Sequence, residues 1–334
     1  MKQQKSFTRM NKKAVITGAN GFIGSNLTRL LTKEGYEVLC LVRSGSDFSL
    51  LPADANILFW KSTSDKAFIT AVKSYEILIH CAALTKAKSR DTFRKANVDL
   101  TLEIVKLFNE TESLNKFIFL SSQAAAGPAL SYSKEKSEDD ICNPISMYGK
   151  SKLLAEHLVR ERVKKSWVII RPVSVYGKGD KDFLQYFRMI KKHLSVQIGK
   201  KDKFINLIYI DDLCELILET IKNPKADKQI FFVSDGIKYS VRDFGKLVEK
   251  AIPSFAFPVR IPEKILSSIA FFNELFSRKT LPILNREKVK EIKCEYWLVS
   301  NVKTKNVLGF SMKPNISNNL QKTYNWYKEH KWIK

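Results

Sequence analysis

The stretch Thr17-Gly18-Ala19-Asn20-Gly21-Phe22-Ile23-Gly24 decides the fold. It follows a short apolar run that begins at Ala14 and leads into an amphipathic segment that ends at Gly35. A strand, a glycine-rich turn and a helix in direct succession are typical of a dinucleotide-binding unit, because the absent Cβ atoms permit a tight turn and close backbone approach to a diphosphate. The amides and dipole at the start of the helix then favour that anion. The expected cofactor contacts here are Gly18, Asn20, Gly21, Phe22, Ile23 and Gly24.

Apolar runs and helical patterns alternate on either side of this turn. The runs are continuous rather than alternating, as expected for strands that helices cover on both faces. We therefore predict an α/β fold with a Rossmann-type, doubly wound parallel sheet, formed by a dinucleotide-binding domain over residues 12–175. The expected strands are residues 14–17, 38–42, 57–60, 77–80, 117–120 and 167–170, and the expected helices are residues 22–34, 65–74, 91–110 and 147–164.

The alternation becomes less regular after Pro172. Residues 176–334 are predicted to form a smaller mixed α/β substrate lobe that closes over the carboxyl edge of the sheet, with some segments returning to the main sheet. The helical patterns there are residues 182–193, 211–221, 241–251 and 316–327, and the strand-like runs are 204–210 and 230–233. An apolar helix over 261–276 has Ile265, Leu266, Ile269, Phe272, Leu275 and Phe276 near helical spacing. That helix is either lobe core or a hydrophobic lid over an apolar substrate that rests on a membrane surface.

The end of the second strand favours one of the two nicotinamide dinucleotides. An acidic residue at this place would bind the adenosine ribose, but the run is Leu41-Val42-Arg43-Ser44. The planar charged fork of Arg43 matches a 2′-phosphate, which favours NADP and leaves NAD as the alternative. A solvated loop arginine is the other interpretation.

Tyr148 and Lys152 open the helix that follows the fifth strand. Their spacing of four places both side chains on one helical face. A phenol that titrates near ~10 needs a neighbouring cation to exchange a proton at neutral pH, and Lys152 supplies that charge. Ser121 and Ser122 end the fifth strand, where ligands bind in such sheets, although either serine alone could simply form a turn. The predicted catalytic residues are Tyr148, Lys152 and Ser122.

Together these features resemble the extended short-chain dehydrogenase/reductase superfamily, described as NAD-dependent epimerases/dehydratases. The resemblance extends over nearly the whole chain. Besides the glycine turn and the Tyr148–Lys152 pair, it rests on His80-Cys81-Ala82-Ala83, Asn97-Val98, Arg171-Pro172-Val173-Ser174-Val175-Tyr176-Gly177 and Tyr209-Ile210-Asp211-Asp212-Leu213.

The resemblance implies a role for each matching residue. Tyr148 would be the general acid/base, Lys152 would bind the nicotinamide ribose and lower the pKa of the tyrosine, and Ser122 would steady the reacting oxygen. Where the family usually has Gly-Asp-Leu-Thr-Asp, this chain has Lys61-Ser62-Thr63-Ser64-Asp65, so the adenine contact falls on Ser62. The remaining implied cofactor contacts are Thr63, Cys81, Ala82, Ala83, Asn97, Pro172 and Val175.

The catalytic residues do not separate the reactions of this superfamily. Arg43 and the apolar helix resemble the dihydroflavonol-reductase and 3β-hydroxysteroid-dehydrogenase branch, which predicts hydride transfer between nicotinamide and a secondary alcohol or ketone. A nucleotide-sugar epimerase or dehydratase, similar to UDP-glucose 4-epimerase, is the alternative. Ile205 stands where such epimerases usually have an arginine for the diphosphate, although lysines at 200, 201 and 203 lie nearby. A non-enzymatic dinucleotide sensor would be expected to lose one of the three catalytic residues.

Composition and charge limit the classes of partner, metal site and location that this chain could have. The 57 Lys and Arg against 34 Asp and Glu give a net charge of +23, but the lysines are scattered and no nucleic-acid module appears, so no nucleic-acid partner is expected. The five cysteines form no C-x-x-C pair, and no metal site is expected. We expect a cytoplasmic enzyme with a small-molecule substrate and no transmembrane span, with peripheral membrane contact left open. The resemblance also implies a homodimer through the helices at 91–110 and 147–164.

Overall fold

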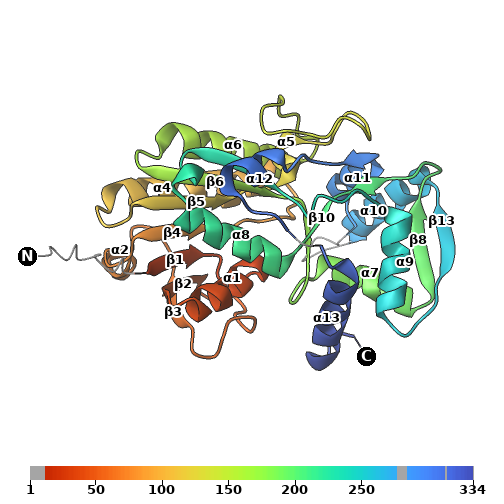
Figure 1. The fold of residues 1–334 in the computed structure, drawn as a ribbon, viewed down its shortest axis with the longest axis horizontal. Helices are drawn as coiled ribbons and strands as arrows, with labels where there is room; N and C mark the ends of the chain where they lie inside the picture. Colours follow the sequence, from red (N-terminus) through yellow and green to blue (C-terminus); the bar gives the residue numbers. More distant parts are fainter. Residues whose placement is uncertain (1–11, 277–283, 313, 334) are drawn as a thin grey trace, which may run out of the picture.

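The computed structural model describes residues 12–276, 284–312 and 314–333. A parallel sheet of seven strands occupies one half of the molecule, in the order β11-β6-β5-β4-β1-β2-β3 (Figure 1). This order, with β1 at the point where the succession reverses, confirms the predicted Rossmann-type architecture. The strands are β1 (Lys13–Thr17), β2 (Glu37–Arg43), β3 (Asn56–Trp60), β4 (Ile77–His80), β5 (Lys116–Leu120), β6 (Ser166–Pro172) and β11 (Gln229–Val233).

Helices cover both faces of this sheet, which is why the central positions of its strands are mostly apolar. Successive side chains of a strand point to opposite faces. Ile118 therefore joins the cluster under α1 and α8, whereas Phe117 and Phe119 join the cluster under α2, α4 and α6. The helices around the sheet are α1 (Phe22–Lys33), α2 (Lys66–Val72), α3 (Arg90–Phe93), α4 (Leu100–Glu110), α5 (Gln123–Ala126), α6 (Met147–Arg162), α8 (Ile210–Lys222) and α12 (Val302–Leu308).

The helix predicted over residues 91–110 is not one regular α-helix. A π-helical segment, Arg94–Asp99, separates α3 from α4. Such segments are rare and occur mostly near functional sites. Asn97 lies buried within it, and its contacts are described with the site below.

The second half of the chain builds the mixed lobe at the carboxyl end of the sheet (Figure 1). One segment returns to the main sheet, since β11 pairs in parallel with β6. The run predicted as one strand over 204–210 is two short strands in different sheets, and α8 already begins at Ile210. The division of the chain at residue 175 stays a prediction. The short helical turn η2 (Pro224–Ala226) packs on α8 and α12 beside the main sheet. The lobe contains β7 (Ser174–Tyr176), β8 (Leu194–Ile198), β9 (Phe204–Ile205), β10 (Leu207–Tyr209), β12 (Tyr239–Ser240), β13 (Phe257–Ile261), β14 (Tyr296–Trp297), α7 (Asp182–Lys191), α9 (Val241–Ala251), α10 (Glu263–Phe276), α11 (Arg286–Lys293) and α13 (Ile316–Glu329).

The apolar helix predicted over 261–276 is α10, which begins at Glu263 because Pro262 precedes it. Leu266 and Ala270 are buried against Val289 of α11 and against the ends of β8 and β13, so this part of the helix is lobe core. Ile265 and Ile269 are exposed. The side chains of Phe272, Leu275 and Phe276 lie outside the described residues. No helix within the described ranges is long and apolar enough to cross a membrane.

Candidate active site

The glycine turn lies between β1 and α1 and packs against the end of β4. Gly18 has φ +67°, and a Cβ added there would lie 2.7 Å from backbone atoms of Ala82. A Cβ on Gly24 would lie 2.3 Å from the carbonyl oxygen of Gly18. Gly21 precedes the first turn of α1 and caps it without a side-chain hydrogen bond. The backbone here forms a cradle that side chains would fill, which fits a bound diphosphate.

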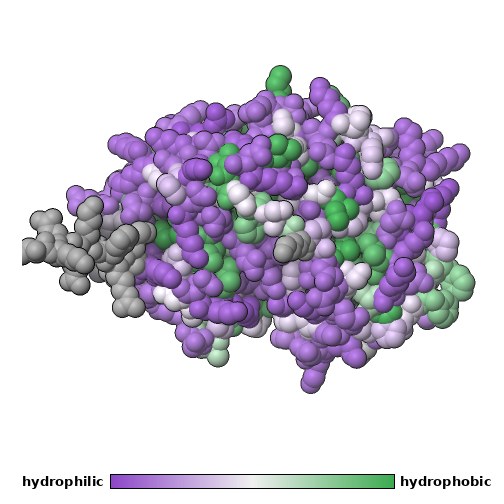
Figure 2. Space-filling view, in the orientation of Figure 1, coloured by the Kyte–Doolittle hydropathy of each residue, from purple (hydrophilic) through white to green (hydrophobic). Residues whose placement is uncertain are grey.

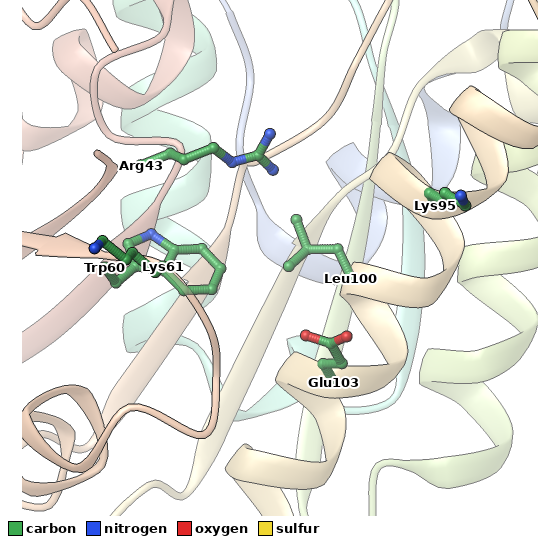
Figure 3. A pocket seen from close by; sticks show the side chains of 6 residues that line it. All are labelled: Arg43, Trp60, Lys61, Lys95, Leu100 and Glu103. Carbon is green, nitrogen blue, oxygen red and sulfur yellow. The ribbon is translucent and has the colours of Figure 1, made fainter. Parts of the chain in front are cut away.

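A shallow pocket of about 200 Å³ lies at the carboxyl ends of β2 and β3 (Figure 3). The guanidinium of Arg43 extends over it from the end of β2, and Leu100 and Glu103 of α4 face it from the other side. Its further lining residues are Trp60, Lys61 and Lys95. Three of the six lining side chains are therefore cationic, which favours an anionic group at this end of the site.

The predicted adenine contact Ser62 and the predicted cofactor contact Thr63 follow Lys61 of this pocket, and each bonds to another side chain of the protein. The hydroxyls of Ser62 and Ser64 are 2.9 Å apart. Thr63 donates to the Glu103 carboxylate at 3.1 Å. On the opposite side of the glycine turn, Asn20 donates to the carbonyl of Asp47 at 2.8 Å and so ties the turn to the loop after β2.

His80 connects the glycine turn to the π-helical segment. Thr101 donates its one proton to the carbonyl of Asn97 at 2.6 Å, so the Nε2–H of His80 donates to Thr101 at 3.0 Å. The Nδ1 atom of His80 then accepts from Thr17 at 2.6 Å. The amide of Ala82 donates in turn to the Thr17 hydroxyl at 3.3 Å. Burial lowers the pKa of His80 to about 3, aided by the charge of Lys152, so the imidazole stays neutral.

Asn97 holds the loop after β4 against the catalytic helix. Its amide oxygen accepts from the Leu84 amide at 2.7 Å, and its Nδ2 donates to the Leu84 carbonyl at 3.0 Å. The same Nδ2 donates to the hydroxyl of Ser151 on α6 at 2.8 Å. Asn97 thus positions the cofactor-side loop, and a direct contact between Asn97 and a cofactor stays a prediction.

Ser122 and the Lys152 ammonium both lie at the carboxyl end of β5. The Ser122 side chain also interacts with the Tyr148 phenol and lowers its pKa. Lys152 is buried one turn further along α6, and its ammonium donates to the carbonyl of Leu120 at 2.7 Å. The same ammonium lies 4.1 Å from the centre of the Phe119 ring. Ser122 caps α5 by accepting from the Ala124 amide at 3.1 Å, so a turn-forming role and a place in the site coincide.

Electrostatics set the resting protonation of these groups. Burial raises the pKa of Tyr148, the carboxylate of Glu291 on α11 raises it further, and the hydrogen bond from Ser122 lowers it in part. Burial lowers the pKa of Lys152 to about 8, although Glu156 and Cys81 oppose this shift. Tyr148 is therefore protonated at neutral pH, while Lys152 titrates close to neutrality.

Sequence reasoning missed an ion pair directly behind these residues. Arg171, at the end of β6, contacts Glu156 of α6 at 2.6 Å, and Ser121 donates to the same carboxylate. Glu156 follows Lys152 by one helical turn, but no sequence pattern links Glu156 to Arg171. Helix α11 was also missed: Glu287 accepts from the first amide of α6, that of Met147, at 2.6 Å.

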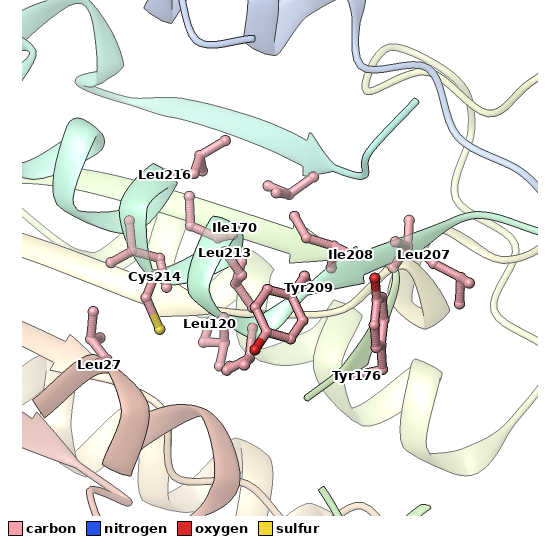
Figure 4. Packing of buried hydrophobic residues seen from close by; sticks show 14 of the residues in the cluster. Leu27, Leu120, Ile170, Tyr176, Leu207, Ile208, Tyr209, Leu213, Cys214 and Leu216 are labelled. Carbon is pink, nitrogen blue, oxygen red and sulfur yellow. The ribbon is translucent and has the colours of Figure 1, made fainter. Parts of the chain in front are cut away.

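The sequence motifs that follow β6 lie where the main sheet meets the lobe. Val175 of β7 pairs with Ile208 of β10, while Pro172 is buried opposite Val233 of β11. Tyr176 and Tyr209 lie together in a buried cluster with side chains of α1, β5, β6 and α8 (Figure 4). The remaining predicted contacts lie around the turn and the end of β4, where Phe22, Ile23, Cys81 and Ala82 are partly buried and Ala83 is exposed.

This fold and this site define a class of dinucleotide-dependent enzyme with a tyrosine, a lysine and a serine at the edge of the sheet. The family model of the NAD dependent epimerase/dehydratase family matches residues 14–234. The chain belongs to this family, within the extended short-chain dehydrogenases/reductases.

Individual relatives include both epimerases and dehydrogenases. A UDP-glucose 4-epimerase from Vibrio cholerae is 31% identical over 76% of this chain and 80% of its own. A decarboxylating sterol-4-alpha-carboxylate 3-dehydrogenase from Dictyostelium discoideum is 26% identical over 82% of this chain and 89% of its own. Among solved structures, a UDP-glucose 4-epimerase from Thermotoga maritima superposes with a TM-score of 0.75 over 95% of this chain and 99% of its own, at 20% identity. The chain is therefore an NAD-dependent oxidoreductase or epimerase by family.

Proposed function

We propose that this protein is an NADP-dependent reductase or dehydrogenase that acts on a secondary alcohol or ketone. One observation supports this best: the Ser122 side chain interacts with the Tyr148 phenol, and the buried Lys152 ammonium bonds to the last carbonyl of β5, two residues before Ser122. Two neighbouring hydroxyls of this kind can both reach a single carbonyl oxygen.

Each side chain has a separate task in the proposed reaction. The cofactor, when bound, supplies or accepts the hydride at the carbonyl carbon. Ser122 donates to the substrate oxygen and orients it, and Tyr148 transfers the proton to or from that oxygen. Lys152 holds the nicotinamide ribose and places a positive charge near the phenol. Gly18, Gly21 and Gly24 hold the diphosphate against the start of α1.

The resting protonation of Tyr148 is the state that the reduction of a ketone requires. Because the pKa of Tyr148 is raised, the phenol carries its proton at neutral pH and begins the reaction as an acid. Reduction of a ketone needs that proton, whereas oxidation of an alcohol needs the phenolate.

The pocket in Figure 3 supports NADP over NAD. Arg43, Lys61 and Lys95 surround the place beyond β2 where the adenosine ribose of such a dinucleotide would lie. A 2′-phosphate would meet three cations there, whereas a ribose hydroxyl would leave Glu103 as the one carboxylate among the lining residues.

A second candidate is a nucleotide-sugar epimerase or dehydratase that uses the same three residues. Its support is the 31% identity with the UDP-glucose 4-epimerase from Vibrio cholerae. Against this candidate, the place where such epimerases usually have an arginine is Ile205, in the central strand of a small sheet.

The proposal extends to assembly and location. We propose a homodimer through α4 and α6, where Leu154 is exposed on the outer face of α6, and a cytoplasmic location.

The decisive experiment compares Tyr148→Phe with Tyr132→Phe, which removes a hydroxyl from an exposed tyrosine. Turnover of a ketone panel with NADPH should fall by about 10²-fold or more in Tyr148→Phe, with NADP affinity nearly unchanged. Tyr132→Phe should retain both. Unchanged turnover in Tyr148→Phe would refute the assignment of the acid.

A thermal-shift and turnover panel separates the two candidates. Ketone-dependent NADPH consumption supports the reductase. Stabilisation by UDP- or GDP-sugars, with conversion of the sugar and no net NADPH consumption, supports the epimerase and overturns the first proposal.

A further inference from the structure

Exposed apolar side chains gather at the end of the lobe that is farthest from the main sheet. Phe255 is 57% exposed, Phe257 63%, Leu194 42% and Val259 37%. These four residues, here called the end patch, come from β8, β13 and the turn before β13. Figure 2 shows apolar side chains at the edge of the molecule where β13 runs in Figure 1. Single exposed apolar residues are ordinary, but a cluster of four in one small region indicates an interaction surface.

Strand register explains why the end patch is uncovered. In the parallel β8–β13 pair, Phe257 lies beside Leu194 and Val259 lies beside Val196, on one face of the ribbon. Helix α10 covers this face only at its far end, where Leu266 and Ala270 pack on Ile198 and Ile261. The same helix exposes Ile265 and Ile269, which extend the apolar surface beyond the ribbon.

The aromatic side chains are held in place before any partner binds. The rings of Phe255 and Phe257 meet edge to face with centres 5.5 Å apart, and the His193 ring lies 4.4 Å from that of Phe255. His193 also bonds through Nδ1 to the carbonyl of Phe255 at 2.8 Å and accepts from the Phe257 amide at 2.9 Å. An ordered apolar surface loses little conformational freedom on docking.

Charge identifies the partner that this surface fits. Lys192 at the end of α7, Arg260 on β13 and Lys264 at the start of α10 are exposed around the end patch, and residues 191–201 and 253–262 contain no aspartate or glutamate. The carboxylate that reaches the turn before β13 is that of Glu249, which accepts from the Ala256 amide at 3.1 Å. Aromatic side chains flanked by cations fit the headgroup region of a bilayer, where rings enter the interface and ammonium groups meet anionic phosphates. The net charge of +23 adds a long-range attraction of the same sign.

We propose that the end patch docks the protein on the surface of an anionic phospholipid bilayer. Phe255, Phe257 and Leu194 enter the interface, and Lys192, Arg260 and Lys264 contact the lipid phosphates. Binding is peripheral and reversible, and it is weaker on zwitterionic lipid and at high salt. The proposal does not depend on which reaction the active site performs.

Sedimentation of the full chain with vesicles tests the proposal. The vesicles contain phosphatidylcholine alone or phosphatidylcholine mixed with phosphatidylglycerol. The test variant is Phe255→Ser/Phe257→Ser. The matched control is Phe48→Ser/Phe59→Ser, which removes another exposed edge-to-face pair, with centres 5.6 Å apart, beside the β3 edge of the main sheet. Circular dichroism and the thermal midpoint establish that each variant is folded.

The wild type should bind the mixed vesicles, and added salt should weaken this binding. Binding should fall about tenfold or more in Phe255→Ser/Phe257→Ser, whereas the control variant should bind as the wild type does. Three outcomes would overturn the proposal: no binding of the wild type to anionic vesicles, unchanged binding of the test variant, or equal binding to both kinds of vesicle. Self-association that the test variant loses, without lipid binding, would assign the end patch to a second copy of this chain instead.

Discussion

The guanidinium of Arg171 and the carboxylate of Glu156 form an ion pair in which both side chains are almost fully buried, 2% and 1% exposed. Two contacts join them, from Nε at 2.9 Å and from Nη2 at 2.6 Å. The pair links the end of β6 to the turn of α6 that follows Lys152, and Ser121 bonds to the same carboxylate beside Ser122. The ion pair and the Ser121 hydrogen bond therefore hold α6, which carries Tyr148 and Lys152, against the ends of β5 and β6.

Arg171→Met should strongly destabilise the protein. It leaves the Glu156 carboxylate buried without its cation, and loss of one partner from a buried pair costs about 3–5 kcal/mol. Urea unfolding measures this loss. The double variant Arg171→Met/Glu156→Met should be less destabilised than the sum of its two single variants, because no uncompensated charge remains. Additive losses would show that the pair is not coupled in the folded protein.

The sequence predicted the sheet well because its signals are local. Strand and helix bounds around the glycine turn agree with prediction to within one residue, since an apolar strand, a turn that excludes Cβ atoms and an amphipathic helix lie in direct succession. The prediction that Tyr148, Lys152 and Ser122 form one site rests on the rule that parallel strands place their carboxyl ends at one edge.

The missed features depend on contacts between distant segments. The Arg171–Glu156 pair needs β6 to lie beside β5, and the effect of Glu291 on Tyr148 needs α11 to pack over the start of α6. Neither relationship has a periodic signal. The π-helical turn at Asn97 was missed for the same reason, because Asn97 bonds to Leu84 and Ser151 rather than to sequence neighbours.

Gly18→Ala should abolish dinucleotide binding far more than it affects folding elsewhere. The new Cβ would lie 2.7 Å from the Ala82 backbone, so the turn must move away from the end of β4. Gly35→Ala is the control, since Gly35 also has a positive φ, +80°, but faces open space. Both variants bear a strain of about 1 kcal/mol. Calorimetry should show at least about a tenfold loss of NADP affinity for Gly18→Ala alone; equal losses would mean that backbone strain is the whole effect.

Arg43→Ala should change the choice of dinucleotide. Removing the guanidinium at the end of β2 should weaken NADP binding by about tenfold, through loss of a charge-assisted contact, and leave NAD affinity nearly unchanged. Arg260→Ala, at an exposed arginine on β13, should change neither. Titrations with both dinucleotides provide the measurement. A parallel loss of NAD and NADP affinity would place Arg43 outside the 2′-phosphate contact.

Cofactor binding should depend on pH through Lys152. Its pKa in the free protein is lowered to about 8 by burial, so the ammonium is charged below that pH and loses its proton above it. Affinity for the dinucleotide should therefore be highest below pH 8 and decline as pH rises through 8 to 9, because a neutral amine holds a ribose hydroxyl less strongly. His80 does not contribute, since its pKa of about 3 keeps it neutral throughout. Lys152→Met should bind more weakly, with a flat profile from pH 7 to 9. A decline that persists in Lys152→Met would assign this titration to another group.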